Sequence, residues 1–303
     1  MFAYQSLSEA SQKAEIRELA LGFFDGLHLG HREVILGQRT PQDLTHSAVL
    51  SFQQHPQSIL FKDAPIKLIT GLPHKQKILH QWGMRHLILL PFNLELAKTS
   101  AETFLQEIGD ALPGLTKIRI GQNFRFGNQR QGNPELIQKW AQPLNIEVFI
   151  VTSLQQDNQP ISSSRIRRLL SERSFDLAQN LLGRPYSILG QVVEGEKLGR
   201  QLGFPTLNLS TEDGLLVPHG VYAGKAHCAD GKSYTAAINI GQRPTVADQA
   251  RTTIEAHLLN FSGDLYGQEV ELEFIRFIRN EIKFSNVLEL QKQLIQDIQS
   301  LSS

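Results

Sequence analysis

The sequence predicts an α/β plus β fold, with an α/β domain over residues 1–182 and an antiparallel β-barrel or β-sandwich domain over residues 183–303. Short apolar runs alternate with helical patterns in the first part, and strand-like runs follow one another without long helices in the second. The pattern changes at Gly183-Arg184-Pro185. Alternating strands and helices form a parallel sheet with helices on both faces, whereas successive strands form an antiparallel barrel or sandwich. A chain of 303 residues is long enough for two such domains.

The first part is expected to contain buried strands at residues 19–23, 47–52, 86–90, 117–120 and 147–152. Helical patterns lie between these strands, at residues 31–38, 72–82, 101–108 and 135–142. A serine cluster after Pro160 opens a further helix, and a second short helix is expected over residues 175–182. This order predicts βαβ units.

The second part is expected to contain strands at residues 186–193, 221–227, 233–240, 253–259 and 270–277. The chain then ends in a helix, which Ser285 or Asn286 can cap and which has Glu289 in its first turn. One face of that helix is apolar, formed by Val287, Leu290, Leu294, Ile298 and Leu301. The barrel domain is therefore expected to carry a terminal helix.

The composition indicates an ordinary cytoplasmic protein. The 30 basic residues balance the 30 acidic ones, which argues against a general affinity for nucleic acid or for an anionic membrane. The single cysteine, Cys228, excludes a disulfide framework and a cysteine-based zinc site. The segment MFAYQSLSEA lacks the features of a secretory signal, and the apolar run at residues 87–92 is too short to span a bilayer. We expect no nucleic-acid or membrane partner, and the sequence leaves the oligomeric state open.

The segment GFFDGLHLGH, residues 22–31, joins a predicted strand to a predicted helix. Gly22 and Gly26 allow a tight turn and a close approach of backbone to a ligand. His28, Gly30 and His31 stand at the start of the helix, where N–H groups favour anions. The two histidines can therefore stabilise charge on a triphosphate. The alternative is a strand–turn–helix with incidental histidines. A zinc site is disfavoured, because two histidines three residues apart at a helix start, without a nearby carboxylate ligand, are not a typical zinc pattern.

Two further segments offer groups suited to a nucleotide. The segment ISSSRIRR places hydroxyls and arginines at a helix start, which suits a departing pyrophosphate. Taken alone, the segment is better explained as a simple helix cap with solvated arginines. The loop GQNFRFGNQRQG, residues 121–132, offers Asn123, Arg125 and two phenylalanines. The chain has no GxxxxGK[ST] motif, so it is not a P-loop enzyme.

Together these segments resemble the HxGH nucleotidyltransferases, and among them the prokaryotic FAD synthetases. The resemblance implies a Rossmann-like domain in which His28 and His31 are catalytic and ATP is bound during transfer of its AMP part. The implied ATP-binding residues are Gly22, Phe24, Asp25, His28, Gly30, His31, Asn123, Ser163, Ser164 and Arg167.

The chain departs from that family at three places. Ser164 stands where threonine is usual, and Asn123 stands where aspartate is common. The segment SFQQHP has Gln53 and Gln54 in place of the family's glutamate and proline, so the role of that loop is open.

The stretch GEKLGRQLGFPTLN, residues 195–208, is a second dense motif. Gly195, Gly199 and Gly203 make this loop flexible. Its backbone amides and the cations Lys197 and Arg200 could together bind phosphate. Thr206 and Asn208 follow on one side of an extended segment, where a hydroxyl and an amide suit a hard cation such as Mg²⁺. A glycine-rich hairpin is the alternative. Glu255 lies in a strand pattern and can accept a proton from a substrate hydroxyl, or can simply face solvent.

From residue 183 onward, five segments resemble those of a riboflavin kinase domain and occur in the same order: GRPYSILGQVVEGEKLGRQLGFPTLNL, HGVYAGKA, INIGQRPTV, IEAHLLNFSGDLYGQEV and FIRNEIKF. The resemblance implies ATP binding by Gly195, Lys197, Gly199, Arg200, Thr206 and Asn208, with Mg²⁺ on the last two. It also implies Glu255 as catalytic base, and Arg279 and Phe284 near the flavin. Both resemblances together cover residues 15–300 and imply a bifunctional enzyme acting on riboflavin, FMN, FAD and ATP.

Two other function classes remain as alternatives. A single-activity adenylyltransferase would use the barrel only to bind flavin, although the intact Thr206, Asn208 and Glu255 argue against it. A flavin-responsive regulator of nucleic acid is disfavoured by the zero net charge.

Overall fold

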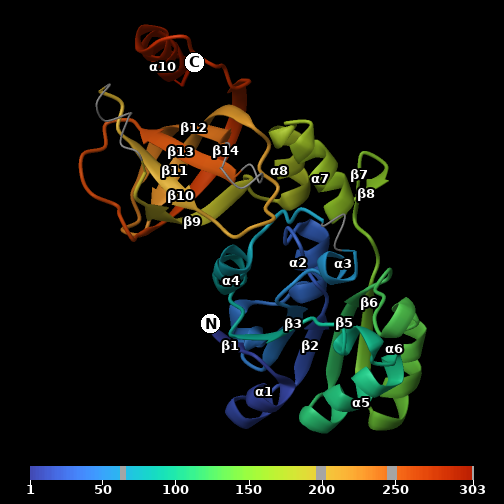
Figure 1. Ribbon diagram of the computed structural model, residues 1–303. Coiled ribbons are helices and arrows are strands. Elements are labelled where there is room, and N and C mark those ends of the chain that lie inside the picture. The colour runs from blue at the N-terminus through green and yellow to red at the C-terminus, as the bar shows by residue number, and fades with distance from the viewer. Residues whose placement is uncertain (62–65, 196–202, 244–250, 302–303) are drawn as a thin grey trace. The chain divides into compact units, whose positions relative to one another are not determined.

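The computed structural model describes residues 1–61, 66–195, 203–243 and 251–301 (Figure 1). The chain divides into two compact units, Met1–Ser163 and Ser164–Ser303, and each is described by itself.

The first unit is built on a six-stranded sheet in the order β1-β4-β3-β2-β5-β6, in which every pair is parallel. Its strands are β1 (Phe2–Tyr4), β2 (Glu18–Leu21), β3 (Ser47–Phe52), β4 (His86–Leu90), β5 (Lys117–Gly121) and β6 (Glu147–Val151). The sequence predicted all of these strands except β1, because three residues are too few to show a period. β2 lies between β3 and β5. Later strands of the chain thus lie on both sides of β2, so the strand order reverses there. In α/β folds, ligands bind at the carboxyl ends of the strands at such a point.

Helices cover both faces of this sheet, as predicted. The α-helices of the first unit are α1 (Leu7–Lys13), α2 (Leu29–Ile35), α3 (Pro56–Leu60), α4 (Leu72–Gln81), α5 (Ala101–Ala111) and α6 (Pro134–Ala141). Leu19 and Leu21 of β2 belong to a buried cluster that includes residues of α1, α5 and α6. Ala20, between them, belongs to a second cluster that includes residues of α2 and α4. Alternate residues of β2 thus pack into two different hydrophobic cores, because successive side chains of a strand point to opposite faces of the sheet.

Shorter elements complete the first unit. They are the 3-10 helices η1 (Pro41–Leu44), η2 (Leu96–Lys98), η3 (Asn128–Arg130) and η4 (Gln142–Leu144), and the hairpin strands β7 (Gln155–Gln156) and β8 (Gln159–Pro160).

The second unit contains a closed antiparallel barrel in the order β10-β13-β12-β11-β14-β9. Its strands are β9 (Ser187–Val193), β10 (Thr206–Ser210), β11 (Gly220–Cys228), β12 (Ser233–Arg243), β13 (Arg251–Leu258) and β14 (Glu269–Arg279). The barrel prediction is confirmed, although β10 was expected only as an extended segment. Ile238 on β12 and Ala256 on β13 are fully buried and face the interior, whereas the residues that alternate with them are half-exposed.

Two helices precede the barrel, α7 (Ser163–Ser171) and α8 (Phe175–Leu182). The ring of Phe175 stacks on Phe274 of β14 with centroids 5.7 Å apart and meets Tyr222 of β11 edge-on at 5.4 Å. These contacts hold α8 against the barrel. The structural division therefore falls at residue 163, whereas the sequence predicts the domain boundary at residues 182–183.

The terminal helix α10 (Val287–Ser300) begins at Asn286, whose side chain accepts the Glu289 N–H at 3.0 Å. The helix is joined to the barrel by Arg279, whose guanidinium donates to both carboxylate oxygens of Asp297, at 2.9 and 2.7 Å. Asp297 is only 3% exposed. In the described residues, no helix is long and apolar enough to cross a membrane.

Replacing Asp297 with Ala is expected to free α10 from the barrel. The change leaves the partly buried Arg279 without its bidentate partner, and breaking such a pair from one side costs roughly 3 kcal/mol. Native-state hydrogen exchange measured by mass spectrometry should therefore show faster exchange of the α10 amides. Gln296→Ala, on an exposed neighbour, is the matched control. Equal protection of α10 in both variants would mean that the ion pair does not hold the helix.

Candidate active sites

The turn after β2 has an unusual backbone. Phe24 has a φ of 56° and Gly26 a φ of 86°, so both lie in the left-handed region. The Phe24 ring is buried and lies directly over Gly22, where an added Cβ would come within 2.7 Å of the ring. A larger residue at position 22 would therefore force the buried Phe24 ring to move. A left-handed residue other than glycine is sustained only where its surroundings hold it in place.

The two predicted histidines are brought together by the start of α2. His28 is the N-cap of that helix, and its Nδ1 accepts the backbone N–H of His31 at 3.2 Å. Gly30 lies in the first turn, and the rings of His28 and His31 stack with centroids 3.5 Å apart. Since Nδ1 of His28 is an acceptor, a neutral His28 ring carries its proton on Nε2. His28 is only 5% exposed, and its ring is fixed by this hydrogen bond and by the stacking on His31.

Asp25 joins the turn to two distant segments. Its carboxylate accepts the backbone N–H groups of Ile69, at 3.0 Å, and Thr70, at 3.1 Å. Its carbonyl oxygen accepts the Ser163 hydroxyl at 2.8 Å, although the two residues are 138 positions apart. The structure thus brings together the glycine-rich turn and the first serine of α7. The carboxylate of Asp25 thus binds backbone amides and helps to shape the turn.

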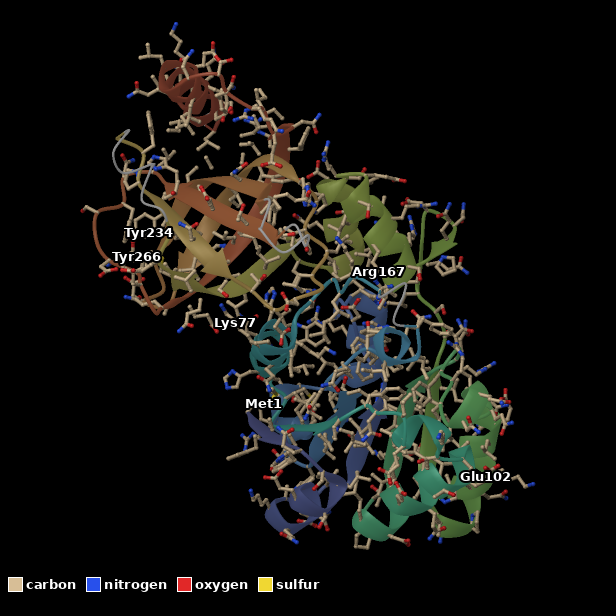
Figure 2. All side chains as sticks on the ribbon, in the orientation of Figure 1. Met1, Lys77, Glu102, Arg167, Tyr234 and Tyr266 are labelled. Atoms are coloured by element: carbon tan, nitrogen blue, oxygen red, sulfur yellow. The ribbon has the colours of Figure 1, made fainter. Side chains whose placement is uncertain are left out.

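Other predicted residues of this site are placed by their elements. Asn123 is exposed just after β5, the neighbour of β2, and its amide donates to the Ser153 hydroxyl at 3.4 Å. Ser164 and Arg167 lie on α7, where Figure 2 labels Arg167.

A buried lysine near the turn was missed in the sequence. Lys75 of α4 is 2% exposed, and its ammonium donates to the Phe23 carbonyl oxygen at 2.6 Å. A single lysine in a helical pattern ordinarily faces solvent, so periodicity contained no signal for it.

The second candidate site lies on the outer face of the barrel. Asn208 of β10 is directly opposite Glu255 of β13, and Glu255 is directly opposite Asn239 of β12. Directly opposed side chains in an antiparallel sheet share one face and lie about 4.5–5.5 Å apart at Cβ. All three residues are half-buried. Asn208, Glu255 and Asn239 thus form a row of polar side chains across three strands. The sequence pattern did not predict Asn239, because only the strand register reveals it.

Gly195, at the start of the loop before β10, packs against Asn208. A Cβ added to Gly195 would lie 2.1 Å from the Asn208 amide nitrogen, so Gly195 leaves the room that this side chain occupies. Thr206, opposite His257, is also half-buried and lies on the same side of β10 as Asn208. The predicted residues Lys197, Gly199 and Arg200 lie outside the described residues.

The two residues expected near a flavin are neighbours. The Arg279 guanidinium carbon lies 6.0 Å from the centroid of the Phe284 ring. The same guanidinium makes the ion pair with Asp297 of α10 described above.

Comparison with known proteins gives a match for each half of the chain. A family model described as FAD synthetase matches residues 10–165, and one described as riboflavin kinase matches residues 182–303. Curated relatives named bifunctional riboflavin kinase/FMN adenylyltransferase match nearly the full length. The relative from Haemophilus influenzae is 35% identical over 98% of this chain and 96% of its own. The relative from Buchnera aphidicola of Schizaphis graminum is 34% identical over 93% and 91%.

A relative of the same name from Escherichia coli K12 is 31% identical over 96% of this chain and 93% of its own. A solved structure from Streptococcus pneumoniae, named as a macrolide-efflux protein, has a TM-score of 0.81 and 26% identity. It covers 100% of this chain and 98% of its own. Neither the family descriptions nor the names of these relatives mention efflux.

Proposed function

The chain belongs to the family of bifunctional riboflavin kinase/FMN adenylyltransferases, and we propose from this premise how its residues divide the two reactions. The enzyme phosphorylates riboflavin with ATP to give FMN, and transfers AMP from ATP to FMN to give FAD and pyrophosphate. The observation that carries this function is that one chain contains both matched halves. We assign adenylyl transfer to residues 1–182 and riboflavin phosphorylation to residues 183–303.

In the kinase reaction, Glu255 is the general base that takes the proton of the ribityl 5′-hydroxyl as its oxygen attacks the γ-phosphorus of ATP. The amides of Asn208 and Asn239 flank its carboxylate on the same face of the barrel. We assign the remaining ATP contacts to Gly195, Lys197, Gly199, Arg200, Thr206 and Asn208, and the flavin contacts to Arg279 and Phe284.

A magnesium ion fits this site. Thr206 and Asn208 supply neutral oxygens on one side of β10, beside the carboxylate of Glu255, and hard cations bind such oxygens together with substrate phosphates. When bound there, Mg²⁺ would neutralise charge on the transferring phosphoryl group. Thr206 and Asn208 are the residues that would hold it.

In the adenylyl transfer, a phosphate oxygen of FMN attacks the α-phosphorus of a second ATP, and pyrophosphate leaves. A phosphate is already a competent nucleophile, so the site needs positioning and charge stabilisation and no general base. His28 and His31 supply that stabilisation, with Nε2–H of His28 as a donor. We assign the ATP contacts to Gly22, Phe24, Asp25, His28, Gly30, His31, Asn123, Ser163, Ser164 and Arg167.

One incubation tests the whole assignment. The purified chain, riboflavin, ATP and Mg²⁺ are combined, and FMN and FAD are followed by chromatography over time. FMN should rise first and FAD after it, both should require ATP, and a chelator should stop FMN formation. A chain that makes FAD from added FMN but no FMN from riboflavin would be an adenylyltransferase alone. The proposal includes a cytoplasmic location, where ATP is supplied to both steps.

Gly195→Ala should slow the kinase reaction without affecting adenylyl transfer. The added methyl group would overlap the Asn208 amide and force it to move, and a displacement of about 1 Å at a reacting site can cost up to about 100-fold. We expect kcat/KM for FMN formation to fall roughly 10- to 100-fold. Gly114→Ala is the control, since an added Cβ there would meet only a carbonyl oxygen at 3.8 Å. Unchanged FMN formation in Gly195→Ala would remove Asn208 from the kinase site.

A further inference from the structure

Lys75 is a buried cation that has no role in either of the two reactions as assigned above. It lies on α4 and is 2% exposed, which makes it one of the largest fully buried side chains among the described residues. Burying an ammonium group is costly unless its charge is compensated by close polar partners. The position of those partners therefore shows what the lysine holds.

Among the contacts of Lys75, two are made with one residue, Phe23, which begins the turn after β2. The Lys75 ammonium donates to the Phe23 carbonyl oxygen at 2.6 Å and lies 4.0 Å from the centroid of the Phe23 ring. The hydroxyl of Ser51 on β3 donates to the same carbonyl at 2.9 Å and lies 3.4 Å from the ammonium. Phe23 is thus held at its backbone by a charged hydrogen bond and at its ring by a cation–π contact.

Continuous contacts lead from Phe23 to the two histidines. The next residue, Phe24, has its φ in the left-handed region, so the turn needs neighbours that hold it. The ring of Phe24 meets the ring of His31 edge-on with centroids 5.3 Å apart, and His31 stacks on His28. A shift of the Phe23 carbonyl would therefore move the surface against which the histidine pair packs.

We infer that Lys75 is a positioning residue for adenylyl transfer: by holding the Phe23 carbonyl it sets the place of Phe24 and of the stacked His28–His31 pair. This rests on the adenylyl transfer assigned above to the first domain.

The test replaces Lys75 with Met, which keeps an unbranched apolar chain and removes the charged donor. In the full-length enzyme, FAD formation from FMN and FMN formation from riboflavin are measured separately. We expect kcat for FAD formation to fall roughly 10- to 100-fold, as for loss of a hydrogen bond from a charged group, with a smaller change in KM for FMN. FMN formation should stay within about two-fold of the unchanged enzyme.

Lys77→Met is the matched control. Lys77, labelled in Figure 2, lies two positions along α4, so its side chain leaves the helix on nearly the opposite side. It should retain both activities. Imidazole NMR resonances of His28 and His31 supply a second readout, which should shift in Lys75→Met and stay in place in Lys77→Met. If circular dichroism shows that Lys75→Met does not fold, Lys75→Gln, which keeps a polar group in the buried position, takes its place.

Three results would overturn the inference: FAD formation within about three-fold of the unchanged enzyme, unmoved histidine resonances, or an equal loss of both activities. The last would make Lys75 a residue of general stability. Failure of the proposed function itself is distinct, because the unchanged enzyme would then make no FAD from FMN.

Discussion

Glu255→Gln should lower the rate of FMN formation by roughly 10²–10⁴, the range expected for loss of a general base. The amide has nearly the same shape as the carboxylate, so the strand pairing with Asn208 and Asn239 is preserved. It can still hydrogen-bond to the substrate hydroxyl, but it cannot take the proton. Conversion of added FMN to FAD should stay intact, because Glu255 belongs to the barrel unit and the adenylyl-transfer turn belongs to the other.

The measurement is the initial rate of each step, with chromatographic separation of riboflavin, FMN and FAD. Glu269→Gln makes the same chemical change at an exposed position of β14, away from the row of Asn208, Glu255 and Asn239. It should leave both rates unchanged. If Glu255→Gln formed FMN at the original rate, the carboxylate would not be the base. If both steps fell together in a folded protein, the division of labour between the two domains would be wrong.

Replacing His28 and His31 together with Ala should stop FAD formation and let FMN accumulate. Each removed donor that stabilises transition-state charge is worth roughly 10²–10³ in rate, so we expect a loss of at least about 10³ for the pair. The change also removes the side chain that caps α2. This loss should lower the free energy of unfolding by about 1 kcal/mol, so the variant should still fold. The kinase rate, read in the same reaction mixture, reports on the integrity of the rest of the chain.

The double variant His46→Ala/His80→Ala is the control for this experiment. Both of those histidines are exposed and lie in the same unit, so they match the number and kind of groups removed. Continued production of FAD by the His28/His31 variant would contradict the assignment of adenylyl transfer to this turn.

Sequence by itself determined the elements and the motifs of this protein, because both are local. A change from the helical period to the strand period is visible within about a dozen residues, and it predicted the parallel sheet, an antiparallel barrel or sandwich, and the terminal helix. The turn with His28 and His31 was likewise predicted from contiguous residues, because its geometry depends on adjacent φ and ψ angles. The two-residue spacing of Thr206 and Asn208 predicted one shared side for the same reason.

Only the tertiary structure decided which distant residues meet. Glu255 could have faced either way on its strand, and the register that sets it between Asn208 and Asn239 depends on how three strands pair, which no local period encodes. The contact of Ser163 with the Asp25 carbonyl spans 138 positions, and the burial of Lys75 beneath Phe23 requires β2, β3 and α4 to be assembled. The motifs were therefore readable from the chain, whereas the groups that hold them in place became visible only once the chain was folded.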